Sequence, residues 1–447
     1  MATSAASRWA LPAFADNRRL RLFLGTMLYL AQGFPQGVIF YAIPSWLAVN
    51  GQPAAAIGLV ATAVTLPWSF KFLMGGVVDR YAYMAMGRRR GWLVGAQFVI
   101  VMCFVGFAVA SPDPSETAVI IAFAFALSIS TAVQDIALDA MVIDLTPEEE
   151  LGQLNGFMFA GKLIGIAGGS AFIAYLIEYH SIETAMLGAM VLFAIPAVSA
   201  LLIRERKGEK LLPWMPGEAS AEAQAVKLDA WLPILKEAFK SLMRRDVLIF
   251  VALVMSYGAH QTISDNSIAL FAANSLGWGE TRLNTLGGIL NLVGAGICLS
   301  VGGWLVDRIG PMKMALMTGL PAAALYIAFV LNDGLWQNST VFTGWYFTSG
   351  LLITQFYLTM LVVTMRVTDE AAAATNFNLL MGAFALGGVV SGLVLGQIDD
   401  WAGFYSLFGM AGALLALSAL LAFGLSARAG GRFAPEEKEP LTGVALP

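Results

Sequence analysis

Long apolar stretches dominate this chain. An α-helix rises about 1.5 Å per residue, so roughly 20 apolar residues cross the hydrocarbon core of a bilayer. Six stretches of this length occupy 20–47, 54–79, 91–110, 116–143, 151–177 and 183–203, and six more occupy 246–273, 282–307, 312–331, 338–365, 372–397 and 403–426. The pattern predicts an all-α polytopic membrane protein with twelve transmembrane helices in two pseudo-symmetric six-helix halves.

One long polar segment, 204–245, separates the two groups of stretches. Its last part, 231–245, alternates apolar residues with lysine and arginine, which is typical of an amphipathic helix on an anionic membrane surface. We therefore divide the chain into an N-terminal half (1–203), a linker (204–245), a C-terminal half (246–426) and a tail (427–447).

The composition agrees with a membrane protein. Hydrophobic residues make up 58% of the 447 residues and charged residues 13%, whereas soluble domains carry about 25% charged residues. Cys103 and Cys298 lie inside apolar stretches, so we expect small buried side chains and no disulfide or metal site. We find no nucleotide-binding loop, no metal-spaced His/Cys cluster and no nucleophile–base set. An enzyme, a cofactor and a nucleic-acid partner are therefore not expected.

The basic residues predict the orientation. If both termini lie on one side, 23 of the 26 lysines and arginines fall on that side, and the exceptions are Lys71, Lys162 and Arg282. Basic loops remain in the cytoplasm, so we expect both termini, the linker and the tail to be cytoplasmic. The first span has no small-residue cleavage site, so we expect a retained helix and not a signal peptide.

A short motif occurs in both halves. Gly75-Gly76-Val77-Val78-Asp79-Arg80 precedes a loop with Arg88, Arg89 and Arg90, and Gly303-Trp304-Leu305-Val306-Asp307-Arg308 follows 228 positions later. This pattern resembles the signature loop of the major facilitator superfamily, which implies a transporter and, by default, a monomer. Glycine permits close helix approach, and an aspartate can pair with arginines or cap a helix. We expect a cytoplasmic gate formed by Gly75, Asp79, Arg80, Arg88, Arg89, Arg90, Asp307 and Arg308.

Four ionisable residues lie inside the spans of the N-terminal half. Counting from the cytoplasmic ends places Lys71, Asp135 and Lys162 roughly 12, 14 and 17 Å deep, and Asp139 one turn below Asp135. Two aspartates one turn apart repel, so one should hold its proton longer unless a lysine intervenes. We expect a site for protons and an anionic substrate; the alternative is a set of neutralised pairs that locks this half together.

The seventh span carries two further candidates, His260 and Asp265. His260 lies near mid-membrane, where it could sense pH or be satisfied by Tyr257 or a backbone carbonyl. Asp265 lies nearer the periplasmic end and could pair with Arg282 as an outer gate. Neutral polar residues that we expect in the cavity wall are Gln32, Gln36, Gln134, Gln355 and Tyr357. Pro35 and Pro44 should loosen the first helix, because the backbone groups they free tend to face a cavity.

A narrower resemblance covers about 60–170 most densely. The run Phe70-Lys71-Phe72-Leu73, then Gly87-Arg88-Arg89-Arg90-Gly91, then Gln134-Asp135 with Asp139, is similar to the anhydromuropeptide permease family, whose relatives import siderophores or carry acetyl-CoA. The resemblance implies proton-driven import of anhydromuropeptides, which are fragments of recycled cell wall, from periplasm to cytoplasm across the lipid bilayer of a bacterial inner membrane. It also implies functional roles for Lys71, Asp135 and Asp139. Two alternatives are a siderophore importer of the same branch and a non-transporting sensor on the same fold.

Overall fold

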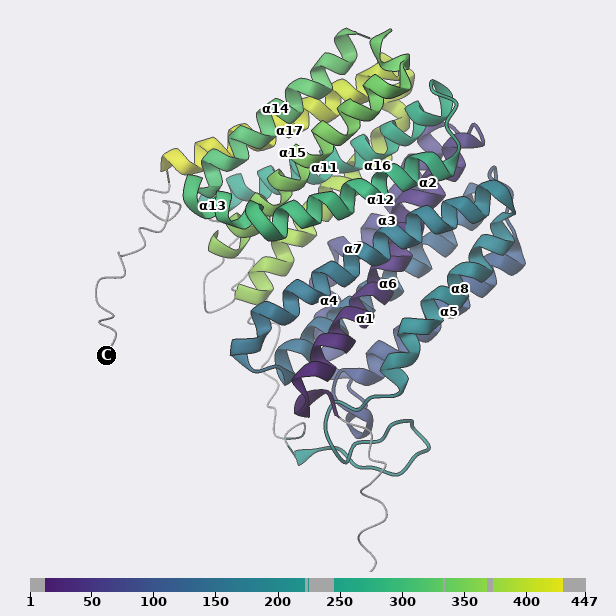
Figure 1. The fold of residues 1–447 in the computed structure, drawn as a ribbon, viewed down its shortest axis with the longest axis vertical. Coiled ribbons are helices and arrows are strands. Elements are labelled where there is room, and N and C mark those ends of the chain that lie inside the picture. Colours follow the sequence, from purple (N-terminus) through teal and green to yellow (C-terminus); the bar gives the residue numbers. More distant parts are fainter. Residues whose placement is uncertain (1–12, 222–223, 225–244, 333, 368–372, 429–447) are drawn as a thin grey trace, which may run out of the picture.

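The computed structural model describes residues 13–221, 224, 245–332, 334–367 and 373–428. Helices before the linker (purple to teal) form one bundle, and helices after it (green to yellow) form a second (Figure 1). No β-strand is assigned in these ranges apart from an isolated bridge between Ala13 and Arg204. The prediction of an all-α fold in two halves is confirmed.

Helix positions agree with the apolar stretches to within a few residues. The N-terminal half contains α1 (Arg18–Gly37), α2 (Ile43–Val49), α3 (Ala54–Ser69), α4 (Lys71–Arg80), α5 (Arg90–Ala110), α6 (Thr117–Leu145), α7 (Glu148–Tyr179) and α8 (Ile182–Leu201). The C-terminal half contains α11 (Arg245–Asn274), α12 (Glu280–Ile297), α13 (Gly303–Ile309), α14 (Pro311–Leu331), α15 (Ser339–Val367), α16 (Ala373–Ala402) and α17 (Tyr405–Arg428).

The described helices do not settle the number of spans. By length and composition nine of them could cross a membrane, or ten if the bent pair of α3 and α4 forms one span. The two other predicted spans coincide with α1–α2 and with α15. The number of twelve transmembrane helices therefore remains a prediction. The expected amphipathic helix at 231–245 lies almost wholly outside the described residues.

The first span changes helix type between its two prolines. Pro35 lies inside α1 and Pro44 near the start of α2, and proline has no N–H for the carbonyl four residues before it. A π-helical turn, Val38–Ala42, joins the two helices, and the N–H of Ile43 donates to the Val38 carbonyl five residues back. The prolines were expected to loosen the first helix, and in the structure the helix widens to a π-helical turn at Val38–Ala42 without breaking.

The second span, predicted as one helix over 54–79, is broken. Helices α3 and α4 meet at an angle of 47°. Pro67 lies in the last turn of α3, and Phe70, with φ −108° and ψ 12°, belongs to neither helix. The break makes Lys71 the first residue of α4. Apolar length alone could not reveal it, because the whole stretch is apolar enough to span.

The two halves pack together at the end opposite the linker. One hydrophobic cluster there contains residues of both halves, including Trp46 of α2 and Phe271 of α11. Thr62 of α3 donates a hydrogen bond of 3.2 Å to the Val389 carbonyl of α16. Where α7 ends and α12 begins, the Glu178 carboxylate accepts a 2.7 Å hydrogen bond from the Thr281 N–H.

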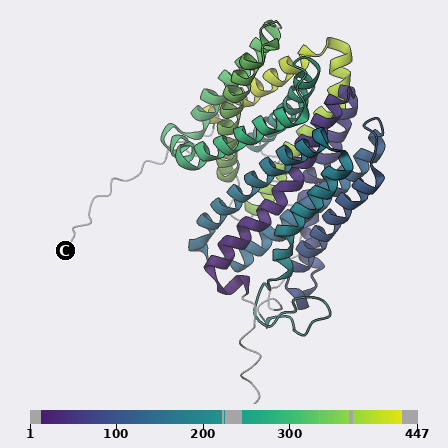
Figure 2. The same cartoon turned by 45° about the vertical axis from the view of Figure 1, so that its right-hand side comes forward.

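Toward the linker end the halves separate. Each half has its own hydrophobic cluster there, one around Phe250 and Met312 and the other around Leu138 and Leu154. Both views show α7 and α12 diverging from the end at which Glu178 meets Thr281 (Figures 1 and 2). The protein is therefore closed at the end opposite the linker and parted toward the linker.

Candidate functional site

Lys71 lies between the two aspartates of α6. Its Nζ forms an ion pair with Asp135 and lies 3.5 Å from Oδ2 of Asp139. The two aspartates are one helical turn apart, so one lysine at the start of α4 reaches both. The structure thus brings three of the four predicted charges into direct contact. We call Lys71, Asp135 and Asp139 the α6 charge cluster.

Helix α1 completes this cluster with two neutral donors. The Gln32 amide donates to Oδ1 of Asp135, and the Tyr29 hydroxyl donates to Oδ1 of Asp139. The Asp135 side chain is only 5% exposed, whereas that of Asp139 is 37% exposed. Asp139 is therefore the carboxylate that solvent reaches, and Asp135 is the one that the protein encloses.

Lys162 of α7 has a different environment. Within the described residues no carboxylate forms an ion pair with it, and its half-buried Nζ lies 5.8 Å from the ring centroid of Trp68. Lys71 lies 5.9 Å from the same ring. Trp68 is held in place because its indole N–H donates to Ser128 Oγ at 3.1 Å. An ammonium group over an aromatic face, with no carboxylate at ion-pair distance in the described ranges, is available to an anionic ligand.

Tyr357 packs within the C-terminal half. This residue of α15 stacks its ring on that of Tyr257 with centroids 6.0 Å apart. The predicted glutamines lie elsewhere in the packing: Gln134 donates to the Leu28 carbonyl at 3.4 Å, and Gln355 donates to the Gly302 carbonyl at 3.2 Å. Gln36 is buried, and its amide nitrogen has no hydrogen-bond partner in the ranges that the structure describes.

His260 is part of the packed core of the C-terminal half. Its Nδ1 lies 2.8 Å from the Ala411 carbonyl, which fixes the proton on Nδ1, and its ring stacks on Tyr257. The side chain is 1% exposed. The backbone carbonyl at Nδ1 fits the alternative of a buried histidine, although Nε2 is buried with no hydrogen-bond partner among the described residues.

Asp265 is partly exposed on α11, and no lysine or arginine that the structure describes forms an ion pair with it. The expected pair with Arg282 does not form, because the Arg282 guanidinium stacks on Trp278, 4.1 Å from the ring centroid. Among the described residues, Asp265 also has no hydrogen-bond partner. An outer gate built on this pair is therefore not present, and the contact of Glu178 with Thr281 occupies that end of the molecule.

The arginines of the motif loop contact their own half. Arg89 pairs with Asp144 at the end of α6 at 3.2 Å, while Arg80 is exposed. Gly75 has open space where a Cβ would lie, so it does not serve close helix packing in this conformation. In the second copy Arg308 lies over the Trp304 ring at 5.3 Å. The side chains of Asp79 and Asp307 lie outside the described residues, so the gate remains a prediction.

The start of the linker holds the motif loop in place. Glu205 accepts hydrogen bonds from the backbone N–H groups of Arg88, Arg89 and Arg90 at 2.9, 2.7 and 2.5 Å, and so caps α5. The Arg90 guanidinium donates to four backbone carbonyls, those of Ala200, Leu201, Lys210 and Leu211. Burial raises the pKa of Glu205 above its usual value, and the backbone donors oppose that shift.

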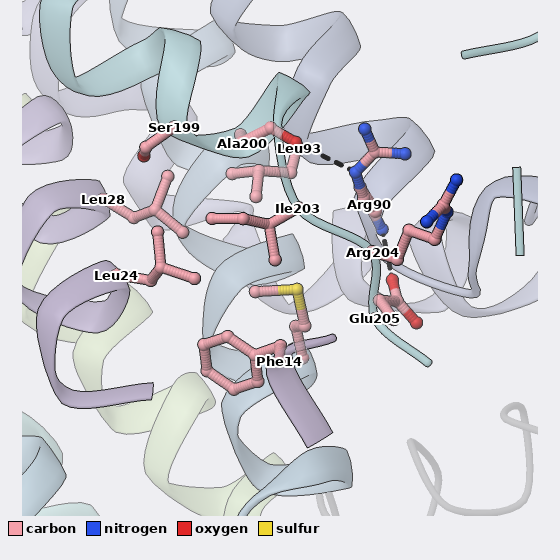
Figure 3. A pocket seen from close by; sticks show the side chains of 11 residues that line it. Phe14, Leu24, Leu28, Arg90, Leu93, Ser199, Ala200, Ile203, Arg204 and Glu205 are labelled. Carbon is pink, nitrogen blue, oxygen red and sulfur yellow. Dashed lines mark hydrogen bonds between the residues drawn. The ribbon is translucent and has the colours of Figure 1, made fainter. Parts of the chain in front are cut away.

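A small pocket lies next to this contact (Figure 3). Leu24 and Leu28 of α1, Phe14 and Ile203 line it together with Arg90 and Glu205. The pocket shares no residue with the α6 charge cluster, and its lining is mostly aliphatic. It is a gap behind the motif loop, and we assign it no role in transport.

Three residues with a role in these contacts were not predicted from the sequence. Tyr29 lies one turn before Gln32 on the same face of α1, a spacing that could have identified it. Trp68 precedes Lys71 by three residues, but only the break at Phe70 brings its ring under both lysines. Glu205 lies in the charged run Arg204-Glu205-Arg206-Lys207, which looks like an ordinary solvated segment.

Two helical halves that are closed at one end and parted at the other, with charged residues inside their spans, define a membrane transporter. This is the architecture of a secondary transporter, in which two halves rock around a central site. A secondary transporter of this kind moves its solute without enzymatic chemistry.

The chain belongs to the Major Facilitator Superfamily, whose model matches residues 25–390. It is 24% identical over 404 residues to the anhydromuropeptide permease of Escherichia coli (strain K12), covering 88% of this chain and 78% of that one. It is 21% identical to the putative transporter AmpG 4 of Rickettsia conorii, covering 91% and 97%.

Solved transporters share the fold. A D-xylose–proton symporter superposes with a TM-score of 0.65 at 15% identity, covering 91% of this chain and 97% of that one. A POT family transporter in complex with a thioalcohol-conjugated peptide superposes with a TM-score of 0.68 at 12% identity, covering 91% and 96%. At these identities the likeness establishes the fold and leaves the substrate open.

Proposed function

We propose that this protein is a proton-coupled importer of an anionic solute, and that the solute is an anhydromuropeptide. The observation that carries the proposal is the contrast between the two lysines. Lys71 is engaged by two aspartates, whereas the half-buried Lys162 forms no ion pair with any carboxylate that the structure describes. A substrate carboxylate supplies the missing counterion at Lys162.

An aspartate of the same site takes up the coupling proton. When a substrate anion attracts Lys71 toward Lys162, one aspartate of α6 loses its counterion. A carboxylate that loses its counterion in a low-dielectric site favours its protonated form. Substrate binding and protonation are thereby linked, as symport requires.

The orientation supports import. If the basic linker lies in the cytoplasm, the structure is closed on the periplasmic side and parted on the cytoplasmic side. This is the inward-facing state. In the outward-facing state the motif residues Asp79 and Asp307, with the arginines next to them, would then close the cytoplasmic side.

Similarity favours anhydromuropeptides among anionic solutes. A relative that shares 24% identity over 404 residues carries the name anhydromuropeptide permease. The test is uptake into proteoliposomes of labelled anhydromuropeptides and of ferric siderophores, with and without a pH gradient. Uptake of the muropeptide alone, stimulated by an acidic exterior, supports the proposal. Gradient-driven uptake of the siderophore alone would assign the protein to the siderophore importers.

A further inference from the structure

Trp68 lies where both lysines of the candidate site meet. The Nζ atom of Lys71 lies 5.9 Å from the centroid of its ring, and that of Lys162 lies 5.8 Å from the same centroid. An ammonium group at this distance is attracted by the negative potential of an aromatic face, and tryptophan attracts it more strongly than tyrosine or phenylalanine. One neutral side chain therefore contacts a lysine that is paired with two aspartates and a second lysine for which the described ranges contain no ion pair.

The indole ring of Trp68 is held from two helices. Its N–H donates a hydrogen bond of 3.1 Å to Ser128 Oγ on α6, and the Ser128 hydroxyl donates in turn to the Val64 carbonyl on α3. Ser128 is fully buried. Trp68 itself belongs to the last turn of α3, directly before the break at Phe70. The ring is therefore a fixed surface, and the flexible side chains of the lysines adjust to it.

The two lysines reach this ring from different helices. Lys71 is the first residue of α4, on the far side of the bend of 47° from Trp68. Lys162 belongs to α7, whose backbone packs closely on α1: a Cβ added at Gly33 would lie 2.1 Å from the Lys162 carbonyl oxygen. This close packing fixes the backbone of Lys162. The position of its ammonium group then depends on its side chain alone.

The ring decides where the ammonium group of Lys162 lies in the free protein. A lysine side chain is long and flexible, so fixing its ammonium group has an entropic cost, and the contact with Trp68 already restricts it. Without the ring, the ammonium group could turn toward the α6 charge cluster, in which two carboxylates share Lys71. The ring therefore favours a Lys162 that stays apart from the aspartates.

Contact with the ring leaves Lys162 able to bind an anion. An ammonium group has three N–H donors, and an aromatic face lies on only one side of it. The donors that point away from the ring can reach the oxygens of a carboxylate. Because Lys71 lies near the same ring, a carboxylate bound at Lys162 also attracts Lys71, which is the movement that links binding to protonation in the proposed function.

We propose that Trp68 is a positioning residue of the anion site: its ring holds the Lys162 ammonium group apart from the α6 charge cluster, so that Lys162 binds a carboxylate of the transported solute. This inference rests on the proposed function and assigns part of its selectivity to a neutral side chain. Since Trp68 acts through Lys162, it matters for solutes that carry the carboxylate and not for those that lack it.

The test compares two forms of one anhydromuropeptide in proteoliposomes, with its peptide carboxylates either free or converted to amides. For the free form, Trp68→Leu should raise the half-saturation concentration about threefold to tenfold while sparing the accumulation ratio. For the amide form, which lacks the negative charge, the variant should change neither value. Trp401→Leu, at a tryptophan of α16 that is 89% exposed, is the matched control and should leave both forms unchanged.

Two further variants separate positioning from a general loss of structure. Trp68→Phe keeps an aromatic face, so its half-saturation concentration for the free form should lie between those of Trp68→Leu and the unmutated protein. If Trp68 acts through Lys162, adding Trp68→Leu to Lys162→Gln should raise that concentration no further.

The outcomes distinguish the positioning role from the proposed function. An unchanged affinity for the free form in Trp68→Leu, an equal loss for both forms, or additive effects in the double variant would overturn the positioning role and leave the proposed function intact. If the unmutated protein takes up neither form, or both with equal affinity, the anion site of the proposed function fails, and the positioning role with it.

Discussion

Replacing Asp135 with asparagine tests whether α6 carries the coupling proton. The substitution preserves the size of the side chain and its hydrogen bond with Gln32 while removing the charge that faces Lys71. If the carboxyl group of Asp135 takes up the proton during transport, the variant cannot use a pH gradient. Exchange of substrate across the membrane needs no net proton movement, so it should survive at a reduced rate.

The size of the effect follows from the structure and from the gradient. Removing one partner of a buried ion pair costs about 3–5 kcal/mol when the other charge is left alone. In the variant, Lys71 Nζ still lies 3.5 Å from Asp139 Oδ2. At an effective dielectric constant of about 20 this attraction is worth about 5 kcal/mol, and solvent lowers it because the Asp139 side chain is 37% exposed. The variant should therefore fold.

A gradient of one pH unit supplies about 1.4 kcal/mol per proton, so one-proton symport accumulates substrate about tenfold, and Asp135→Asn should lower that ratio to about one.

Gradient-driven accumulation and counterflow would be measured in the same vesicles at matched protein content, with the membrane potential clamped. Asp113→Asn, in the exposed loop between α5 and α6, makes the same charge change away from the cavity and should retain full accumulation. If Asp135→Asn and Asp139→Asn both accumulate substrate like the unmutated protein, the α6 charge cluster is structural, and the coupling group must be sought elsewhere.

Further variants separate binding, conformational change, stability and orientation. Lys162→Gln should raise the half-saturation concentration about tenfold while sparing the accumulation ratio, and a lost ratio with unchanged binding would contradict the anion-binding role. Glu178→Gln weakens the contact that closes the end opposite the linker, so distances between spin labels across that end should lengthen; identical distance distributions would remove its gating role. Glu205→Ala leaves three backbone donors at the start of α5 without an acceptor and should cost about 2–4 kcal/mol of stability in detergent, whereas the exposed Glu218→Ala should leave the melting temperature unchanged. A cysteine in place of Tyr81, which is 68% exposed in the motif loop, should react with an impermeant reagent from the cytoplasmic side alone, and labelling in intact cells would reverse the orientation.

The fold could be predicted largely because the bilayer restricts what a chain can do. A lipid-exposed backbone must be helical, so each long apolar stretch indicates a helix, and the repeated motif indicates two halves. The depth count also placed Lys71 and Asp135 in one layer, and the structure pairs them. Both predictions depend on the spacing of residues along single helices, and the sequence gives that spacing directly.

Contacts between distant segments were harder to predict. The break at Phe70, and with it the position of the Trp68 ring under Lys71 and Lys162, depends on how α3 and α4 pack. The expected pair of Asp265 with Arg282 failed because Trp278 offers Arg282 an aromatic face four residues away on the same segment. Counting rise per residue gives the depth of a side chain but not its direction around the helix.

The most direct test of proton-coupled import is the movement of protons when substrate is added. Vesicles with a pH-sensitive dye inside, and with no initial pH gradient, would receive an outward-to-inward gradient of anhydromuropeptide. If import is coupled to protons, the lumen acidifies as substrate enters, and Asp135→Asn abolishes the acidification while exchange continues. Entry of substrate into vesicles of the unmutated protein without acidification would contradict proton coupling.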